Sequence, residues 1–88
     1  MMSESMSEEA GEIIVNLYGG LEKYSPDNIR KGNTIGKDRV DSIADILNFY
    51  SIPDEEVQVI LVDGKHAERE SSVSSGSNVS IFPLVGGG

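Results

Sequence analysis

The end of the sequence limits most strongly what this chain can fold into. Positions 78 to 88 read Asn-Val-Ser-Ile-Phe-Pro-Leu-Val-Gly-Gly-Gly, so a run with strand character stops at Pro83 and three glycines close the sequence. A glycine run buries no side chains and loses more conformational entropy on ordering than other residues do. We therefore expect residues 78–82 to form the last strand, with Val79 and Ile81 on its core face and Phe82 on the opposite face.

The three glycines fit a tail that enters a narrow slot in another protein, because a backbone without Cβ atoms is thin. Gly86 and Gly87 are then expected to give the tail the length that it needs to extend into this slot. Gly88 is expected to present an unhindered terminal carboxylate, which we interpret as the reacting group.

Phe82 lies next to this tail, and two interpretations of it stay open. Together with Pro83 and Leu84 it is typical of a partner-docking patch, because an exposed aromatic side chain offers apolar area to another protein. Alternatively, Phe82 packs against the far side of the sheet or against a neighbouring strand.

The composition argues against several classes of function. The chain has 88 residues, 15 acidic and 7 basic residues for a formal net charge of −8, and no cysteine. Such a domain is not expected to bind nucleic acid or an anionic membrane surface. The acidity favours basic protein partners, or it only keeps the surface solvated. Without cysteine there is no disulfide, zinc–thiolate site or thiol nucleophile, and no metal or bound cofactor is expected.

The N-terminal residues have no basic start and no apolar run, so they do not form a secretory signal. Residues 1–11 are mainly Ser, Glu and Met without periodicity, and we expect a disordered acidic leader. No segment approaches the roughly 18 apolar residues of a membrane helix, which makes a cytoplasmic protein the expectation.

The first half of the chain is expected to hold two strands. Residues 12–18 alternate in character, with Ile13, Val15 and Leu17 on one face. The glycine pair that follows lacks the Gly-Lys-Ser/Thr of a phosphate loop, so a turn is expected there. Residues 28–36 are expected to form a polar second strand beside the first.

Four basic residues in and after this second strand carry most of the positive charge: Arg30, Lys31, Lys37 and Arg39. They either form a small anion-binding patch or only offset part of the negative charge of a very acidic surface.

Residues 40–50 show the clearest helical period. Apolar residues recur there at steps of three and four and would form the buried face: Val40, Ile43, Ala44, Leu47 and Tyr50. Asp38 or Asp41 is expected to cap the start of this helix. Pro53 pushes the residue before it out of helical geometry, so the helix is expected to end near Tyr50 or Ser51.

Residues 57–62 are apolar almost throughout, which predicts a strand buried on both faces in the middle of a sheet. The Asp-Gly pair after it is a strong hairpin signal and predicts a short return strand. That strand contains His66, which has no second ligand or nucleophile nearby and is interpreted as a surface residue. The polar loop that follows is expected to be anchored by Val73.

This order of elements predicts an α+β fold of the β-grasp, or ubiquitin-like, type: a mixed sheet of four to five strands with one main helix on one face. The first and last strands would lie adjacent and parallel in the middle of the sheet. We expect the β-grasp domain to span residues 12–85, after the leader at 1–11 and before a flexible glycine tail at 86–88.

The sequence also resembles the ubiquitin-like sulfur-carrier family, which includes the small subunit of molybdopterin synthase and the thiamine sulfur carrier. The resemblance rests on Leu-Val-Asp-Gly-Lys at 61–65, a polar loop with a glycine turn, and residues 79–88, where a strand ends in aromatic and proline residues before Gly-Gly. It covers residues 12–88.

Two positions depart from the family pattern. Family members often have Pro-Pro where this chain has Pro83 and Leu84, and Gly86 stands where Ala or Ser is common. Neither departure touches the terminal pair Gly87 and Gly88. The departures therefore bear on the choice of partner more than on the chemistry of the tail.

The resemblance implies a carried cosubstrate and not an enzyme. An ATP-dependent adenylating enzyme, similar to ubiquitin activators, would attach AMP to the Gly88 carboxylate. Sulfur from a persulfide on a sulfur donor protein then replaces AMP and leaves a thiocarboxylate. The tail would enter the larger subunit of molybdopterin synthase and give its sulfur to a pterin precursor, in the synthesis of a molybdenum or tungsten cofactor.

Three other roles stay open. One is a sulfur carrier for thiamine synthesis. Another is a ubiquitin-like modifier that is joined to target lysines through Gly88. The third is a plain β-grasp binding domain whose glycines are incidental. The sequence does not distinguish the pathway, the oligomeric state or the true start site.

Overall fold

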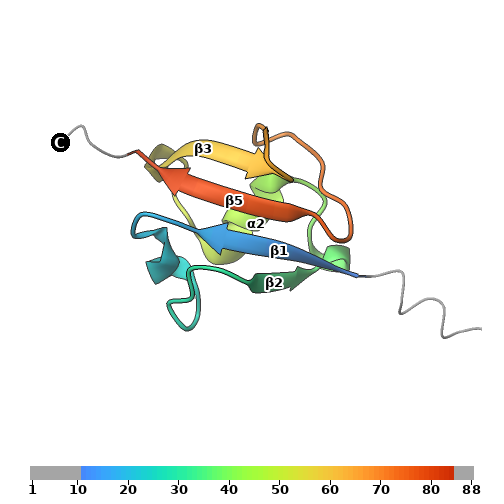
Figure 1. Ribbon diagram of the computed structural model, residues 1–88, viewed down its shortest axis with the longest axis horizontal. Coiled ribbons are helices and arrows are strands. Elements are labelled where there is room, and N and C mark those ends of the chain that lie inside the picture. The colour runs from blue at the N-terminus through green and yellow to red at the C-terminus, as the bar shows by residue number, and fades with distance from the viewer. Residues whose placement is uncertain (1–10, 85–88) are drawn as a thin grey trace, which may run out of the picture.

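The first and last strands lie side by side in the interior of the sheet (Figure 1). The structure of the protein is a computed structural model that describes residues 11–84. The described strands are β1 Glu12–Leu17, β2 Asn33–Gly36, β3 Val57–Val62, β4 Lys65–His66 and β5 Asn78–Pro83. The described helices are α2 Ile43–Tyr50 and the short 3₁₀ helices η1 Leu21–Tyr24, η2 Lys37–Arg39 and η3 Asp54–Glu56.

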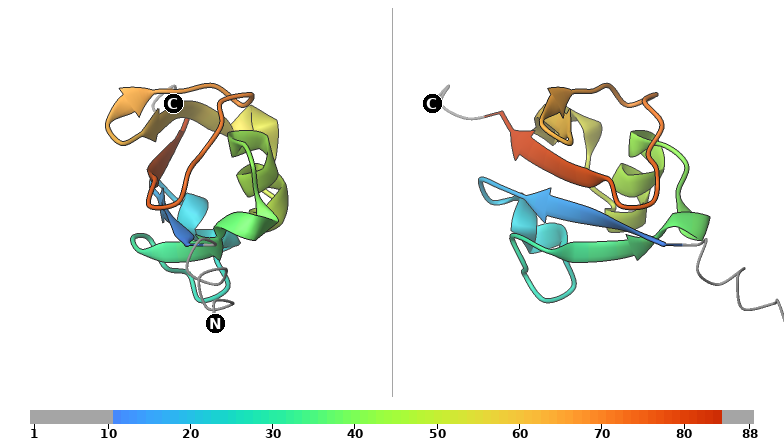
Figure 2. Two further views of the ribbon diagram at one scale, coloured as in Figure 1. Left: turned by 90° about the vertical axis from the view of Figure 1, so that its right-hand side faces the viewer. Right: turned by 45° about the vertical axis from the view of Figure 1, so that its right-hand side comes forward.

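The sheet has the strand order β2-β1-β5-β3-β4. β1 and β5 run parallel, with Ile14 opposite Asn78 and Leu17 opposite Ile81, and the other neighbouring pairs run antiparallel. A parallel pair needs a long crossover connection, and that connection carries α2, which packs on one face of the sheet (Figure 2). The predicted α+β, β-grasp architecture and its parallel inner pair are confirmed.

The core lies between α2 and one face of the sheet. The face that the alternation predicted for β1 is buried, since Ile13, Val15 and Leu17 are each 0% exposed. From β5, Val79 and Ile81 are also 0% exposed. Full burial of a side chain of this size is worth about 1.5–3 kcal/mol relative to leaving it in water. The two inner strands therefore contribute much of the stabilisation of the fold.

The start of α2 differs from the prediction. The predicted capping residues Asp38 and Asp41 lie before the helix, and Ser42 is the N-cap. The Ser42 hydroxyl accepts a hydrogen bond from the backbone N–H of Asp45 at 3.4 Å, and the Asp45 carboxylate accepts one from the backbone N–H of Ser42 at 3.3 Å. This reciprocal pair satisfies two N–H groups at the helix start, which a lone aspartate cap does not.

The buried side of α2 is broader than the predicted stripe. The helix ends at Tyr50, as predicted. Ile46, which the stripe omitted, is 0% exposed, whereas Ala44, which it included, is partly buried. The segment after β4 runs along the start of the helix, where the backbone N–H of Ala44 donates to the carbonyl of Arg69 at 2.9 Å. Val73 in this segment is 5% exposed, which confirms it as the anchor of the loop.

β3 lies inside the sheet, between β5 and the short β4, but it is not buried on both faces, which corrects that part of the prediction from its apolar run. Its outer neighbour β4 pairs with it only at Leu61 and Val62, across the Asp-Gly turn that the sequence predicted. Within β3 only Ile60 is buried, because none of the helices in residues 11–84 covers the other face of the sheet (Figure 2). His66 on β4 is exposed, as its interpretation required.

The segment between β1 and β2 forms a 3₁₀ helix and a loop in place of a long second strand. β2 covers four residues, against the predicted 28–36. The side-chain amide of Asn33 donates to the carbonyl of Ile29 at 2.9 Å, and the Asn33 side-chain oxygen lies 3.0 Å from the Ser25 hydroxyl. Short polar side chains compete in this way with the strand ladder, which explains the shorter strand.

Gly11 is the part of the predicted leader that the structure describes. Its carbonyl accepts a hydrogen bond from the backbone N–H of Lys37 at 3.2 Å. The remainder of the leader, position 85 and the tail at 86–88 lie outside the described residues, so the leader and the tail stay predictions.

Candidate functional site

The predicted site lies where β5 ends, and the structure places the three residues that precede the tail. Phe82 and Pro83 are partly buried, and Leu84 is 66% exposed. The three terminal glycines lie outside the described residues and stay predictions. The described part of the site therefore consists of the end of β5 and the elements that surround it.

Phe82 packs against the neighbouring strand on the sheet face that α2 does not cover. Its ring stacks on the ring of Tyr18, with centroids 4.7 Å apart and planes at 7°. A stacked aromatic pair contributes about 0.5–1.5 kcal/mol beyond the area that it buries. This contact fits the second interpretation of Phe82, and the ring is still partly open to solvent.

Two further apolar side chains share this face and were not assigned to the site from the sequence. Val59 lies opposite Phe82 in the strand register, and Leu61 lies opposite Ser80. Val59, Phe82 and Tyr18 therefore form an apolar row from β3 across β5 to the end of β1. The signal for it was the nearly continuous apolar run of β3, which was interpreted as burial on both faces.

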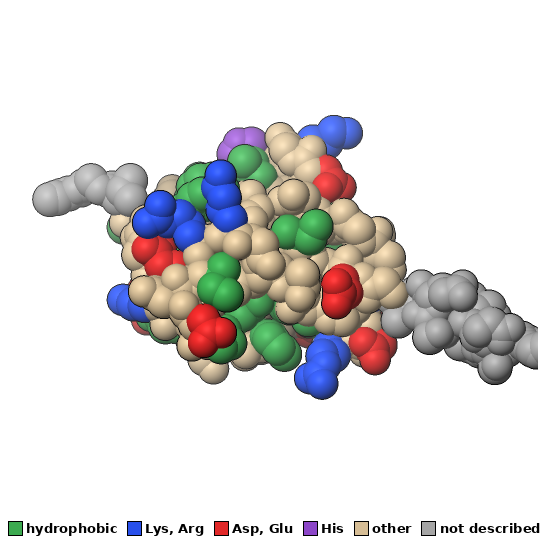
Figure 3. Space-filling view, turned by 60° about the horizontal axis from the view of Figure 1, so that its bottom comes forward, with side chains coloured by type: hydrophobic (Ala, Val, Ile, Leu, Met, Phe, Trp, Pro, Cys, Tyr) green, Lys and Arg blue, Asp and Glu red, His purple; other side chains and the backbone are tan. Residues whose placement is uncertain are grey.

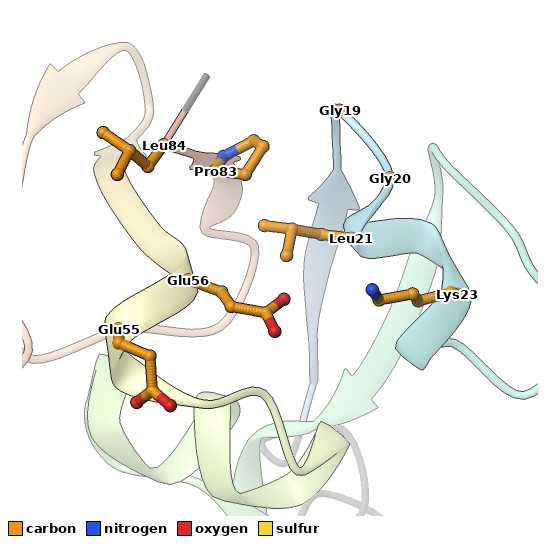
Figure 4. Close-up of a pocket in the computed structure, with 8 residues that line it drawn as sticks. All are labelled: Gly19, Gly20, Leu21, Lys23, Glu55, Glu56, Pro83 and Leu84. Atoms are coloured by element: carbon orange, nitrogen blue, oxygen red, sulfur yellow. The ribbon is translucent and has the colours of Figure 1, made fainter. Parts of the chain in front are cut away.

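A groove of about 380 Å³ lies beside the end of β5, between η1 and η3 (Figure 4). In Figure 4 the side chains of Lys23 and Glu56 reach into it from these two helices. The groove is lined by Gly19, Gly20, Leu21, Lys23, Glu55, Glu56, Pro83 and Leu84. Charges of both signs thus lie next to the last described residue of the chain.

Tyr24 joins the two sides of this groove. Its hydroxyl donates to the Glu56 carboxylate at 3.0 Å, and the Lys23 ammonium lies 5.3 Å from the centre of its ring. Burial raises the pKa of the Tyr24 hydroxyl above its usual value of 10.0, and the hydrogen bond to Glu56 and its charge raise the pKa further. The phenol is therefore protonated at neutral pH and holds η1 against η3.

The basic residues near β2 lie next to acidic ones. A guanidinium nitrogen of Arg30 is 3.6 Å from the carboxylate of Glu22, and the Lys37 ammonium is 3.2 Å from that of Asp41. Figure 3 shows basic and acidic side chains interspersed over the face that it draws. Exposed pairs of this kind contribute about 0–1 kcal/mol. For Arg30 and Lys37 the structure therefore favours the interpretation that they offset negative charge on the surface, and not the interpretation that they form an anion-binding patch.

Within residues 11–84, no group of three or more His, Asp and Glu side chains is placed to hold a metal ion. In the same part of the chain, no helix has the length and apolar character needed to span a membrane.

One helix on one face of a mixed sheet, with parallel first and last strands, defines the ubiquitin-like β-grasp class. Within this class, the chain belongs to the family described as Mut7-C ubiquitin, which matches residues 10–86. The predicted resemblance to ubiquitin-like proteins is thereby confirmed. No curated protein matches the sequence significantly.

Three solved structures from Haloferax volcanii share this fold. The crystal structure of SAMP1 has a TM-score of 0.64 and 16% identity, over 89% of this chain and 100% of that one. A crystal structure of small archaeal modifier protein 1 has a TM-score of 0.65 and 14% identity, over 85% of this chain and 99% of that one. The solution structure of the HVO 2177 protein has a TM-score of 0.66 and 20% identity, over 89% of this chain and 87% of that one. The name of the family denotes a ubiquitin-like domain, the name of small archaeal modifier protein 1 denotes a modifier, and none of the printed names denotes an enzyme.

Proposed function

We propose that the protein is a sulfur carrier whose terminal Gly88 carboxylate is activated and then converted to a thiocarboxylate. The observation that carries this proposal is the position of Leu84, which is 66% exposed at the end of an inner strand. Only Val85 separates Leu84 from the three glycines of the sequence. Leu84 thus lies just before the thin segment that we propose to enter a partner and react.

Activation is needed because a carboxylate is a poor acyl electrophile. A carboxylate oxygen of Gly88 attacks the α-phosphate of ATP and releases pyrophosphate, in the active site of a separate adenylating enzyme. The terminal sulfur of a donor protein's persulfide attacks the acyl carbon and releases AMP. The intermediate is an acyl persulfide, in which the C–S bond is new and the S–S bond is that of the original persulfide. A second thiol of the donor attacks the donor-side sulfur and breaks this S–S bond, which leaves the thiocarboxylate on Gly88 and a disulfide on the donor.

The pathway that we propose is synthesis of the molybdopterin cofactor, in the cytoplasm. The support is the resemblance of residues 79–88 to the small subunit of molybdopterin synthase. The partners would be an adenylating enzyme, a sulfur donor protein and the larger synthase subunit, and ATP would be used by the first of these. Synthesis of thiamine is the other sulfur-transfer pathway that the same segment fits.

A second candidate is a ubiquitin-like protein modifier. It is favoured by one specific observation, that small archaeal modifier protein 1 is among the solved structures with the same fold. In this role the activated Gly88 carbonyl would be attacked by a lysine amine of a target, and an isopeptide bond would form as the leaving group departs. Both roles share the activation step and differ in the nucleophile that follows.

The test is intact mass spectrometry of the protein purified from its own cells, with fragmentation of the C-terminus. A species heavier by the difference between one sulfur and one oxygen atom, located on Gly88, is the expected result. Gly88 found joined to lysines of other proteins, with only unmodified carboxylate on the free protein, would replace the carrier role by the modifier role. Intact activity in the cell after deletion of Gly87 and Gly88 would contradict both and leave a plain binding domain.

Gly87→Val is expected to reduce adenylation at least about 100-fold, because a branched side chain next to the reacting group blocks a narrow slot and displaces the carboxylate. The rate of ATP-dependent pyrophosphate exchange measures this. Gly86→Ala is the matched control, since a small residue is common there in the sulfur-carrier family, and it should keep most of the rate. Equal rates for Gly87→Val and the parent protein would contradict the threading of the tail.

A further inference from the structure

We infer that Gly19 and Pro83 together fix the direction in which the chain leaves the sheet, and that Gly19 is a positioning residue for the tail. The contact between them lies at the last residue of β5. The inference depends on the proposed function only for its effect on a reaction rate. Its geometric part stands independently of that function.

The ends of β1 and β5 contact each other in register, one residue after the next. The backbone N–H of Tyr18 donates to the carbonyl of Ile81 at 3.1 Å. The ring of Tyr18 stacks on Phe82, and Gly19 lies against Pro83. Pro83 is therefore the last residue of β5 that this series of contacts holds.

Only glycine fits at position 19. Its φ is +62°, a conformation that side chains with a Cβ rarely adopt. A Cβ built there would lie 2.5 Å from Cγ and 2.8 Å from Cδ of Pro83. These ring atoms are bonded back to the Pro83 backbone, so they do not rotate away as the end of a flexible side chain does. A side chain at position 19 must therefore displace Pro83 or the turn.

A displacement of Pro83 would change the direction of the residues after it. Val57 of β3 lies opposite Pro83 on the side away from β1, so Pro83 lies between β3 and the turn that follows β1. Leu84, 66% exposed, is the first residue beyond this contact. The four residues from Val85 to Gly88 span at most about 14 Å, so they offer little length to correct a wrong starting direction while a partner holds the domain.

The geometric test compares Gly19→Ala with Gly20→Ala. Gly20 also has a positive φ, +99°, but a Cβ there meets no atom within 4 Å, so this control carries the backbone strain without the contact. Residual dipolar couplings of the Leu84 amide report its orientation relative to the amides of β1 and β5. We expect Gly19→Ala to change the Leu84 coupling while the couplings in β1 and β5 stay as in the parent protein. An unchanged coupling at Leu84, or the same change in Gly20→Ala, would overturn the inference.

Pro83→Ala provides a second variant, which keeps the inference testable where Gly19→Ala fails to fold. It removes the two ring atoms that face Gly19, so the Leu84 coupling should shrink as the amide becomes less restricted. In this background Gly19→Ala should fold and have little further effect on Leu84. Retention of the parent coupling in Pro83→Ala would contradict the role of the contact.

The rate is measured by pyrophosphate exchange with the adenylating enzyme purified from the same cells. We expect Gly19→Ala to lower kcat/KM about tenfold relative to Gly20→Ala, with the loss reduced in the Pro83→Ala background. If the parent protein is not adenylated at all, the proposed function fails, and the couplings at Leu84 still decide the inference. Equal kcat/KM in the two alanine variants would contradict the positioning role.

Discussion

Short polar side chains decide several local structures of this protein. Asn16 of β1 is 8% exposed. Its side-chain amide donates to the side-chain oxygen of Asn78 at 2.7 Å, and its own side-chain oxygen accepts a hydrogen bond from the backbone N–H of Gly32 at 3.0 Å. A buried amide left unpaired would cost about 1–3 kcal/mol. The alternation of β1 placed Asn16 opposite the core face. The alternation did not predict the hydrogen-bond partners of Asn16, because one of them, Asn78, lies 62 residues away in the sequence.

The hydroxyl of Tyr24 is expected to titrate above its usual pKa, first because of burial and then because of Glu56. Glu56→Gln should lower this pKa, since it removes the carboxylate charge next to the phenol. The ultraviolet absorbance of tyrosinate measures the shift, and Tyr24→Phe assigns the titration step. Glu55→Gln is the matched control and should have a smaller effect, because the charge of Glu55 raises the pKa of Tyr24 less than the contact with Glu56 does. An equal pKa in the Glu56→Gln variant and the parent would contradict the role of this contact.

The same shift predicts how stability depends on pH. The pKa of Tyr24 is higher in the folded than in the unfolded state, so folding favours the protonated phenol. Its contribution is present in full below the unfolded-state pKa of about 10 and is lost as the pH rises through the folded-state pKa. Burial raises the pKa of Tyr50 in the same direction.

At the scale of elements, β5 combines two roles along six residues. Its middle is core, with Val79 and Ile81 at 0% exposure, and its end carries the candidate site. The alternation of the strand separates these roles by face, because successive side chains point to opposite sides of a sheet. Substitutions on β5 are therefore expected to affect either folding or recognition according to their position.

Ile81→Ala should lower the free energy of unfolding by about 2–5 kcal/mol, because it leaves a cavity between the sheet and α2. Leu84→Ala should change the free energy by less than about 0.5 kcal/mol, because Leu84 is 66% exposed. Urea denaturation followed by circular dichroism measures both. Similar losses of stability in the two variants would contradict the division between the core face of β5 and the site at the end of this strand.

Element boundaries were predicted where the signal is local. The end of α2 at Tyr50 and the hairpin after β3 follow from backbone restrictions of proline and glycine, and both are confirmed. The start of α2 was wrong, because several capping residues stand close together and the sequence does not rank them. The predicted burial of β3 on both faces was wrong, because an apolar run does not reveal whether a second layer covers both faces of the sheet.

For the whole molecule, the net charge of −8 has a measurable consequence. Self-repulsion of a folded chain with this charge is screened by salt, since the Debye length falls to about 8 Å at physiological ionic strength. The melting temperature should therefore rise between low and physiological salt, by several degrees for each kcal/mol gained. Near the isoelectric point of about 4.4 the rise should be much smaller, and an equal rise there would contradict a charge effect.

The sequence by itself determined the order of the strands and of the main helix, the core faces of β1 and β5, and the end of the helix. These features are local, because periodicity, proline and glycine act on neighbouring residues. The tertiary structure alone decided the stacking of Tyr18 on Phe82 and the contact of Gly19 with Pro83. Such contacts join residues more than sixty positions apart, and they depend on the parallel register of β1 and β5, which no local pattern specifies.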